Sequence, residues 1–251
     1  MKRSTGRTTG KPSAPPRGTV TLAIDVGGSG LKAALLDEDG AMLGDRVRVP
    51  TPEGASPEGM VDALETLVAP LSGFDRVSIG FPGVVRRGRV LTAPHFGNEP
   101  WRDFPLAEAL GQRLGGKPVR LLNDADVQGY GVIRGEGLEL VLTLGTGMGS
   151  SLFRDGVCMP HMEFAQFPFR KKKTFNHYVG NAARHKVGDK KWNRRVEKTI
   201  EAFRTLLHFD RLYLGGGNAT KVTLELPPDV SIVDNAAGLT GGIKLWRDAA
   251  L

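Results

Sequence analysis

The chain has 251 residues, 40% of them hydrophobic and 24% charged, which is ordinary for a soluble globular protein with one large domain or two lobes. No apolar run approaches the roughly 20 residues that a membrane-spanning helix needs, and the N-terminus lacks the apolar core of a secretory signal. The single cysteine, Cys158, excludes an internal disulfide and any multi-cysteine zinc site. We therefore expect a cytoplasmic protein without membrane association.

The net charge of +7 is unevenly distributed. Residues 1–18 carry five basic side chains and no acid, and residues 170–198 carry eleven basic and two acidic side chains. The remainder of the chain is therefore acidic. A basic segment on an acidic body indicates a polyanionic partner, such as a nucleic acid, a phosphate chain or an acidic surface. A solvated helix face together with a disordered tail at 1–18 explains the same charges, and both interpretations stay open.

The stretch Leu22–Leu36 predicts a strand, a tight turn and a second strand. Gly27, Gly28 and Gly30 leave the backbone N–H groups of the turn open to an anion, and Asp25 ends the first strand. No helix follows the turn and no G-x-x-x-x-G-K-[ST] motif occurs, which excludes a Rossmann fingerprint and a P-loop.

The rest of the first half alternates strands and helices. A third strand is expected at Ala41–Val49, and Ser56 and Pro57 begin a helix that Pro70 ends. The segment from Ala93 to Trp101 either lines a cleft or anchors a loop, and we favour the anchor for Trp101. The other expected elements are a strand at Val77–Phe81, a basic hairpin tip at Arg86–Arg89 and a short helix at Pro105–Leu114.

Polar residues end the next strand, which begins at Val119. We expect a helix from about Val127 to Ile133 with Asp126 as its cap. Asn123 and Asp124 then lie at the carboxyl end of the strand, where side chains project into the crevice of an open α/β sheet.

A second glycine turn, Gly145–Gly149, joins the strands Glu139–Leu144 and Ser150–Phe153. It repeats the arrangement at Leu22–Leu36 about 120 residues further on. Two such hairpins predict two related half-molecules, each with a phosphate-sized cluster of backbone N–H groups.

The last third contains the basic tract Arg170–Lys173 and two expected helices. The second, from about Trp192 to His208, has an apolar stripe at helical spacing. A strand at Arg211–Leu214, the third glycine turn at Gly215–Asn218, a strand at Val230–Val233 and a helix that begins at Asn235 follow. The stripe consists of Val196, Ile200, Phe203, Leu206 and Leu207, and the closing helix would bury Ile243, Leu245 and Trp246.

Taken together, these motifs resemble the ROK sugar kinases of the actin-like ATPase superfamily, and among them most closely the polyphosphate glucokinases. The resemblance runs in order from about Val20 to the end of the chain. It rests on the stretches Asp25–Lys32, Asn123–Asp126, Leu144–Gly149, Glu163–Phe164, Leu214–Asn218 and Asn235–Leu239.

The resemblance implies an α/β protein with the two-lobed, ribonuclease H-like fold of the actin-like ATPases and a cleft between the lobes. The first lobe would hold residues 19–117, with the helix 236–251 packed back on it. The second would hold residues 118–235, including the basic helical region 170–208. A homodimer is expected, although the sequence itself does not give the oligomeric state.

The resemblance also implies the site. Asp124 would accept the proton of a sugar 6-hydroxyl, and Asp25 would lie near Mg²⁺. Four side chains would hold the sugar: Asn123, Glu163, Gln166 and His95. The donor, polyphosphate or ATP, would lie on Gly27, Gly28, Ser29, Gly30, Lys32, Gly145, Thr146, Gly147 and Gly149, with an adenosine against Gly215, Gly216 and Gly217. Lys171, Lys172 and Lys173 would extend the site as a track for polyphosphate.

The chain departs from the family pattern in the sugar-binding stretch. Where the family has Glu-x-Gly-His-x-Glu, this chain has Glu163-Phe-Ala-Gln-Phe-Pro168, and the zinc motif of many relatives is absent. Hydrogen bonds to substrate hydroxyls set specificity, so glucose is not fixed as the acceptor.

We therefore weigh two functions. A Mg²⁺-dependent hexose kinase is favoured, and a catalytically silent ROK-like protein that binds a sugar or polyanion for regulation is the alternative. Specific DNA binding is not expected, because a helical DNA-reading domain does not fit in 18 residues.

Overall fold

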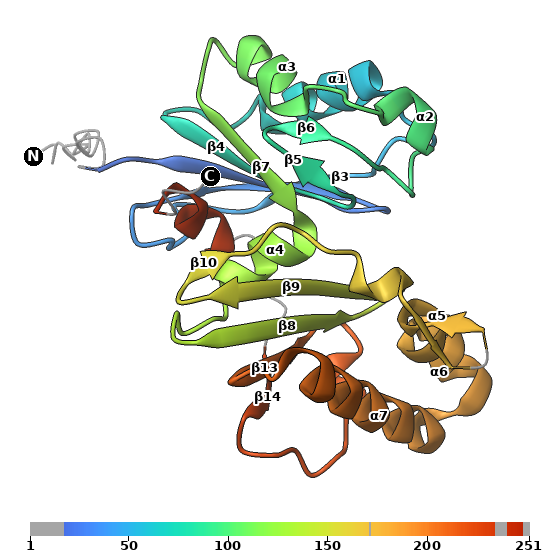
Figure 1. Cartoon of the computed structure of the whole chain (residues 1–251). Helices are drawn as coiled ribbons and strands as arrows, with labels where there is room; N and C mark the ends of the chain where they lie inside the picture. Colours follow the sequence, from blue (N-terminus) through green and yellow to red (C-terminus); the bar gives the residue numbers. More distant parts are fainter. Residues whose placement is uncertain (1–17, 171, 234–239, 248–251) are drawn as a thin grey trace, which may run out of the picture.

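The computed structural model describes residues 18–170, 172–233 and 240–247. Two lobes, each built on a five-stranded sheet, lie one above the other with a short helix between them (Figure 1). The strands of the first sheet, in spatial order, are β3 (Val47–Val49), β2 (Leu31–Leu36), β1 (Thr21–Val26), β4 (Arg76–Phe81) and β7 (Val119–Asn123).

The second sheet has the same topology. In both sheets the first strand of the lobe is central, the next two strands add on one side by antiparallel pairing, and the last two are parallel to the first. This confirms the two related halves that the repeated hairpin predicts. The second sheet contains β10 (Val157–Cys158), β9 (Met148–Arg154), β8 (Leu138–Leu144), β13 (Arg211–Gly215) and β14 (Val230–Ile232).

Helices cover both sheets on their outer faces and fill the space between them (Figure 1). Helices α1 (Pro57–Val68) and α3 (Leu106–Arg113) pack on the first sheet. Helices α5 (Phe175–Val179) and α7 (Asp189–Leu207) pack on the second. The inner layer consists of α4 (Asp124–Tyr130) and the 3₁₀ helix η3 (Gly241–Trp246), which contact one another.

The remaining elements are short. They are α2 (Asn98–Trp101), α6 (Asn181–Val187), the 3₁₀ turns η1 (Phe164–Gln166) and η2 (Ala219–Lys221), the hairpin β5 (Val85–Arg86) and β6 (Arg89–Val90), and the hairpin β11 (Pro168–Arg170) and β12 (Lys173–Thr174).

Successive side chains of β8 point to opposite faces of the sheet, so this strand contributes to two hydrophobic cores. Leu140, Leu142 and Leu144 join the core that contains Trp192 of α7. Val141 on the opposite face joins a smaller core with Val127 of α4. The central strand of the lobe is therefore buried on both faces.

The closing segment is fixed to the first sheet by hydrogen bonds. The Ser78 hydroxyl of β4 donates to the Gly242 carbonyl at 2.6 Å, and the Trp246 indole donates to the Ser78 oxygen at 2.9 Å. Ile243 and Leu245 are buried as predicted. The expected start of this helix at Asn235 lies outside the described residues.

Several expected boundaries are wrong. The third strand begins at Val47, because residues 41–46 pair through a single bridge at Met42 and otherwise follow an irregular, exposed course. Strand β7 completes the first sheet, so that sheet extends to Asn123 instead of ending at 117. Three helices follow the basic tract instead of two, because Gly180 and Gly188 interrupt the expected helical run.

The burial of Trp101 and Leu206 can be compared with the sequence predictions. Trp101 is fully buried and its indole donates to the Ala55 carbonyl at 3.2 Å, which confirms it as a loop anchor. Leu206, expected in the apolar stripe of α7, is 60% exposed because Val196, Ile200, Phe203 and Leu207 repeat at helical spacing and Leu206 lies to one side of that stripe. Among the described residues, no helix is long and apolar enough to cross a membrane.

Candidate active site

Three parallel strands of the first sheet end at one edge and bring polar residues together there. Asp25 of β1 pairs in register with Gly80 of β4, and Phe81 of β4 pairs with Asn123 of β7. The carboxyl ends of such strands form the crevice in which open α/β sheets bind ligands. The edge therefore carries Asp25, Asn123 and the residue after it, Asp124.

Helix α4 begins directly at this edge, and Asn123 is its cap. The Asn123 side-chain oxygen accepts from the Ala125 N–H at 2.8 Å, and its amide donates to the Gly83 carbonyl at 3.0 Å. The prediction that Asp126 caps a later helix is wrong. Asn123 accepts from the Ala125 N–H at the start of the helix, so the helix begins three residues earlier and Asp126 lies in its first turn.

Asp124, the first residue of α4, lies between strands of the two lobes. A Cβ placed on Gly80 of the first sheet would lie 3.4 Å from its Cα, and a Cβ on Gly149 of the second would lie 3.2 Å from the neighbouring Ala125. A Cβ on Gly80 would be in van der Waals contact with the helix start, whereas one on Gly149 would also clash with the Thr143 hydroxyl. Residues of both sheets thus fix the position of the helix start.

The environment of the Asp124 carboxyl group favours its neutral form. Water reaches the side chain, but the surrounding protein of both lobes displaces much of its hydration, and this desolvation raises the pKa to about 7. The negative charges of Asp25 and Asp126 raise the pKa further, and the Ala125 N–H and His161 oppose them. A carboxylate with this pKa is suited to accept a proton near neutral pH.

The first glycine turn is fixed by its own backbone and by two neighbouring segments. The Gly27 N–H donates to the Gly30 carbonyl at 3.1 Å, and the Thr51 hydroxyl donates to the Gly27 carbonyl at 2.6 Å. The ring of His95 lies 3.6 Å from where a Cβ on Gly28 would be. The structure therefore brings His95, predicted from another part of the chain, to this turn, beside the exposed Ser29.

Basic side chains accompany the first turn. Lys32 forms an ion pair with Asp25 at 2.8 Å across the hairpin. The Arg48 guanidinium lies 3.0 Å from where a Cβ on Gly30 would be. Sequence reasoning missed Arg48; the only signal was its place in the alternating segment Arg46–Val49, opposite Lys32 in β2.

The second glycine turn is held by asparagines that the sequence analysis did not single out. The Asn176 side chain accepts from the Met148 N–H at 2.9 Å, and it would clash with any side chain on Gly147. The Asn181 N–H donates to the Gly145 carbonyl at 3.0 Å and to that of Thr146 at 3.2 Å. The turn is thus fixed to the α5–α6 junction.

The third glycine turn lies beside the second because β13 pairs with β8 in parallel. Gly216 has φ +83° and approaches the Leu144 backbone too closely for a side chain. The Asn218 amide donates to the Gly145 carbonyl at 3.1 Å, and Arg184 donates to the Asn218 oxygen at 2.8 Å. The structure therefore joins Gly145–Gly149 and Gly215–Gly217 into one surface.

A buried ion pair connects helix α4 to the expected sugar-binding segment. The two oxygens of Asp126 lie 3.1 and 3.0 Å from His161 Nδ1, and both side chains are nearly fully buried. On its other side, His161 Nε2 lies 3.6 Å from the Glu163 carboxylate. Asp126 is therefore a partner of His161, and Glu163 is tied to the helix that carries Asp124.

The other predicted residues lie on the exposed part of the second lobe. Gln166 ends η1, and Pro168 begins β11. Lys172 and Lys173 are exposed at the β11–β12 hairpin, whereas Lys171 lies outside the described residues. The described residues of the tract, Arg170, Lys172 and Lys173, lie in the β11–β12 hairpin, which contacts α5 (Figure 1).

No group of three or more His, Cys, Asp and Glu side chains that could hold a metal occurs in the described parts of the chain. Mg²⁺ in phosphoryl-transfer sites is commonly held by one or two carboxylates together with substrate phosphates and water. The interacting Asp25 and Asp124 carboxylates fit such a site.

Comparisons with known proteins agree with this geometry. The polyphosphate glucokinase of Mycobacterium tuberculosis (strain CDC 1551 / Oshkosh) is 31% identical over 240 residues, which cover 88% of each chain. The N-acetylmannosamine kinase of Escherichia coli O157:H7 is 38% identical over 141 residues, 54% of this chain and 48% of the relative. The crystal structure of an inorganic polyphosphate/ATP-glucomannokinase from Arthrobacter sp. strain KM superposes with a TM-score of 0.79 at 29% identity, covering 90% of this chain and 97% of that one.

The fold, the site and these relatives together define a phosphotransferase with an alcohol acceptor, built on the actin-like ATPase fold. The model of the ROK family matches residues 21–160, more than half of the chain. The chain belongs to the ROK family.

The Asp126–His161 pair predicts a pH-dependent stability. Burial alone lowers the His161 pKa, but hydrogen bonds to Asp126 and Glu163 outweigh it and raise the pKa to about 9. Because the folded-state pKa exceeds the unfolded value of 6.5, the stabilisation is complete below about pH 6.5 and is lost as the pH rises through 9.

We compare the free energy of unfolding, measured in urea at pH 6 and at pH 9.5, between the parent and the double variant Asp126→Asn/His161→Gln. The free energy of unfolding should be lower at pH 9.5 in the parent, and this decrease should exceed that of the double variant by on the order of 1 to 3 kcal/mol. The double variant is the control because it removes both titrating groups without leaving one buried charge unpaired. Equal pH dependence in the two proteins would contradict this account of the pair.

Proposed function

We propose that the protein transfers a phosphoryl group from polyphosphate or ATP to the 6-hydroxyl of glucose or a similar hexose. The observation that carries this proposal is the position of Asp124 at the start of α4, between the two sheets, with a pKa of about 7. The names of the relatives support it, because those that match most of the chain are polyphosphate glucokinases.

In this proposal Asp124 is the catalytic base. Phosphoryl transfer requires little covalent chemistry from the protein beyond orienting the acceptor hydroxyl and accepting its proton. An ionised Asp124 can accept that proton, and its raised pKa makes it a better base than an ordinary carboxylate at neutral pH. Its attachment to a helix start that two sheets hold keeps the carboxylate in one place.

The glycine turns would hold the donor. Their backbone N–H groups can donate to phosphate oxygens, and Lys32 and Arg48 place positive charge beside the first turn. The surface formed by Gly145–Gly149 and Gly215–Gly217 would hold the second end of the donor, including an adenosine when ATP is used. Mg²⁺, when bound near Asp25, would neutralise charge on the donor phosphates.

The acceptor would lie between His95 and the Glu163 segment. His95 is beside Gly28 of the first turn, and Glu163 lies 3.6 Å from His161, so the two would contact the acceptor from different lobes. Gln166 can hydrogen-bond a hydroxyl, but Pro168 has no side-chain donor or acceptor. The Asn123 side chain already makes two bonds within the protein, which leaves one amide hydrogen for a sugar.

Lys171, Lys172 and Lys173 would guide a polyphosphate chain. A polymer of phosphates needs positive charge beyond the reacting group, and the exposed β11–β12 hairpin offers it without using residues of the base helix. ATP, which has only three phosphates, would depend on this hairpin less.

A regulatory sugar- or polyanion-binding protein without turnover is the second candidate. The specific observation in its favour is the replacement of the family's His and Glu by Gln166 and Pro168. The fold itself also occurs in a ROK family transcriptional regulator, a homologue of the Escherichia coli MLC protein, at a TM-score of 0.70 and 15% identity.

Replacing Asp124 distinguishes the kinase from the regulatory binding protein. We expect hexose 6-phosphate formation by the parent with polyphosphate or ATP, and a kcat at least about 100-fold lower in Asp124→Asn, the usual effect of losing a positioned base. A coupled assay with a panel of hexoses measures both. Asp39→Asn is the matched control, because Asp39 is exposed in the turn after β2 and should leave kcat unchanged.

Retention of full activity by Asp124→Asn would remove that residue from the role of base. Absence of turnover by the parent with every hexose and both donors would favour the regulatory protein instead.

The basic hairpin has its own test. Changing Lys171, Lys172 and Lys173 to Ala should raise the KM for polyphosphate several-fold more than the KM for ATP, because only the polymer reaches the hairpin. The control variant Arg102→Ala/Arg113→Ala removes exposed charge from the first lobe and should leave both KM values unchanged. An equal rise for the two donors would contradict a polyphosphate track.

A further inference from the structure

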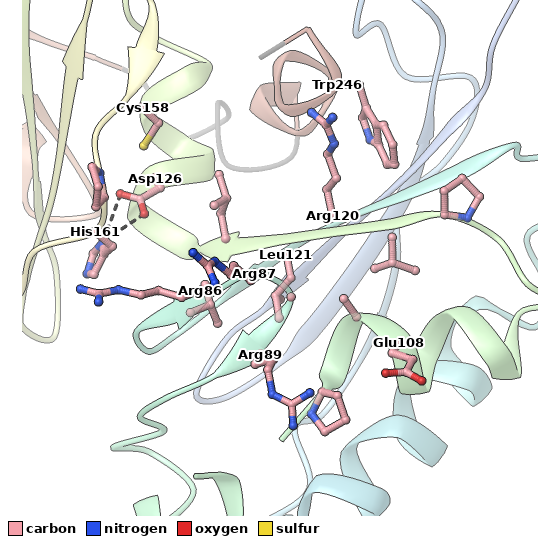
Figure 2. A pocket seen from close by; sticks show the side chains of 18 of the residues that line it. Arg86, Arg87, Arg89, Glu108, Arg120, Leu121, Asp126, Cys158, His161 and Trp246 are labelled. Atoms are coloured by element: carbon pink, nitrogen blue, oxygen red, sulfur yellow. Dashed lines mark hydrogen bonds and ion pairs between the residues drawn. The ribbon is translucent and has the colours of Figure 1, made fainter. Parts of the chain in front are cut away.

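A second cleft lies on the other side of α4 from the base. It has a volume of about 950 Å³, within the range of small-molecule sites, and both lobes line it. The first lobe contributes the β5–β6 hairpin, α3 and β7, and the second lobe contributes Val157–His161 (Figure 2). Trp246 of η3 closes one end.

This cleft is separate from the candidate active site. Asp126 belongs to its lining, whereas Asp124 and the three glycine turns do not. Residues two apart on a helix point in different directions, so the first turn of α4 presents Asp124 to one side and Asp126 to the other. The buried Asp126–His161 pair lies in the lining of this cleft.

The charges in the cleft are mainly positive, and two of them have no partner among the described residues. Arg89 is paired with Asp103, and Arg120 packs over the Trp246 ring and donates to the Leu245 carbonyl. Within the described chain, no hydrogen bond or ion pair holds the exposed guanidinium groups of Arg86 and Arg87.

The two arginines lie between Leu121 and the Asp126–His161 pair (Figure 2). Asp126 is balanced by His161, whose charge is retained at neutral pH. Glu108, the other acid in the lining, lies at the α3 end of the cleft (Figure 2). An anion that enters the cleft therefore meets two guanidinium groups that no described residue pairs with, and such groups form strong hydrogen bonds with carboxylate or phosphate oxygens.

The remaining walls are aliphatic and offer little to a sugar or to a planar base. Among the described residues, no Ser, Thr, Asn, Gln or Tyr side chain lines the cleft, so few polar groups other than the charged ones are available to sugar hydroxyls. The Trp246 ring is not open for stacking, because Arg76 and Arg120 both pack on it, at 5.0 and 4.8 Å. The apolar surface comes from Val85, Val119, Leu121, Leu122, Val157 and Met159.

We propose that this cleft is a second ligand site, which binds an amphiphilic anion: a carboxylate or phosphate head group on Arg86 and Arg87 with an aliphatic chain along Leu121, Leu122 and Met159. Such a ligand would contact both lobes without entering the candidate active site. The proposal does not depend on the proposed kinase activity, since binding is measured without turnover.

Calorimetric titration of the full chain tests the site, with octyl phosphate and octanoate as probes. We expect saturable binding of one molecule per chain, and binding at least about 10-fold weaker for inorganic phosphate and for 1-octanol, which each lack half of the ligand. The tighter of the two octyl anions identifies the preferred head group.

The double variant Arg86→Ala/Arg87→Asn should bind octyl phosphate at least about 10-fold more weakly, the effect of losing a hydrogen bond to a charged group. Asn at position 87 tolerates the left-handed backbone there, where φ is 49°. Arg102→Ala, which removes an exposed arginine outside the cleft, should bind like the parent.

The only cysteine in the chain, Cys158, lines the cleft and locates the ligand. Octyl phosphate should slow its modification by a thiol reagent in the parent and not in the arginine double variant. Absence of saturable binding, unchanged affinity in that variant, or a modification rate of Cys158 that the ligand does not alter would overturn the proposal.

Discussion

The geometry of the site depends on one constraint, the start of helix α4 in the space between two sheets. The Asn123 amide joins the last residue of β7 to the Gly83 carbonyl and to the first turn of the helix. Gly80 and Gly149 then allow strands of both lobes to approach that turn without a side chain between them. With the backbone fixed in this way, Asp126 lies in the lining of one cleft and pairs with His161, whereas Asp124 lies outside that cleft.

Local patterns predicted much of this fold, because the forces that form those elements act over a few residues. A glycine turn predicted the hairpin at Leu22–Leu36, and capping predicted the helix that begins at Ser56 and Pro57. Helical periodicity predicted the apolar stripe of Val196, Ile200 and Phe203. The cap of α4 shows the limit of such reasoning. Both Asn123 and Asp126 are good capping residues, and the choice is decided by the Gly83 carbonyl, which is 40 residues away in sequence.

The sequence did not predict the side-chain contacts in the site between residues that are far apart in the chain. Asp126 and His161 are 35 residues apart, and neither local segment indicates the other as its partner. The same holds for Asn218, which reaches back 73 residues to the second glycine turn, and for Arg48, which lies beside the first. These contacts follow from the order of strands in each sheet, where β13 lies next to β8 and β3 next to β2. The resemblance to ROK sugar kinases supplied the candidate site residues, whereas the hydrogen bonds and ion pairs that hold them in place required coordinates.

The central claim is that Asp124, with its pKa raised to about 7 by desolvation and by neighbouring carboxylates, accepts the proton of the acceptor hydroxyl. Its most direct measurement is the pH dependence of kcat/KM for the best hexose at saturating donor. A base must be ionised to act, so kcat/KM should fall as the pH drops through about 7, and this acid limb should be missing from the residual activity of Asp124→Asn. A limb near the ordinary carboxyl pKa of about 4, or one near 7 that persists in Asp124→Asn, would contradict the account.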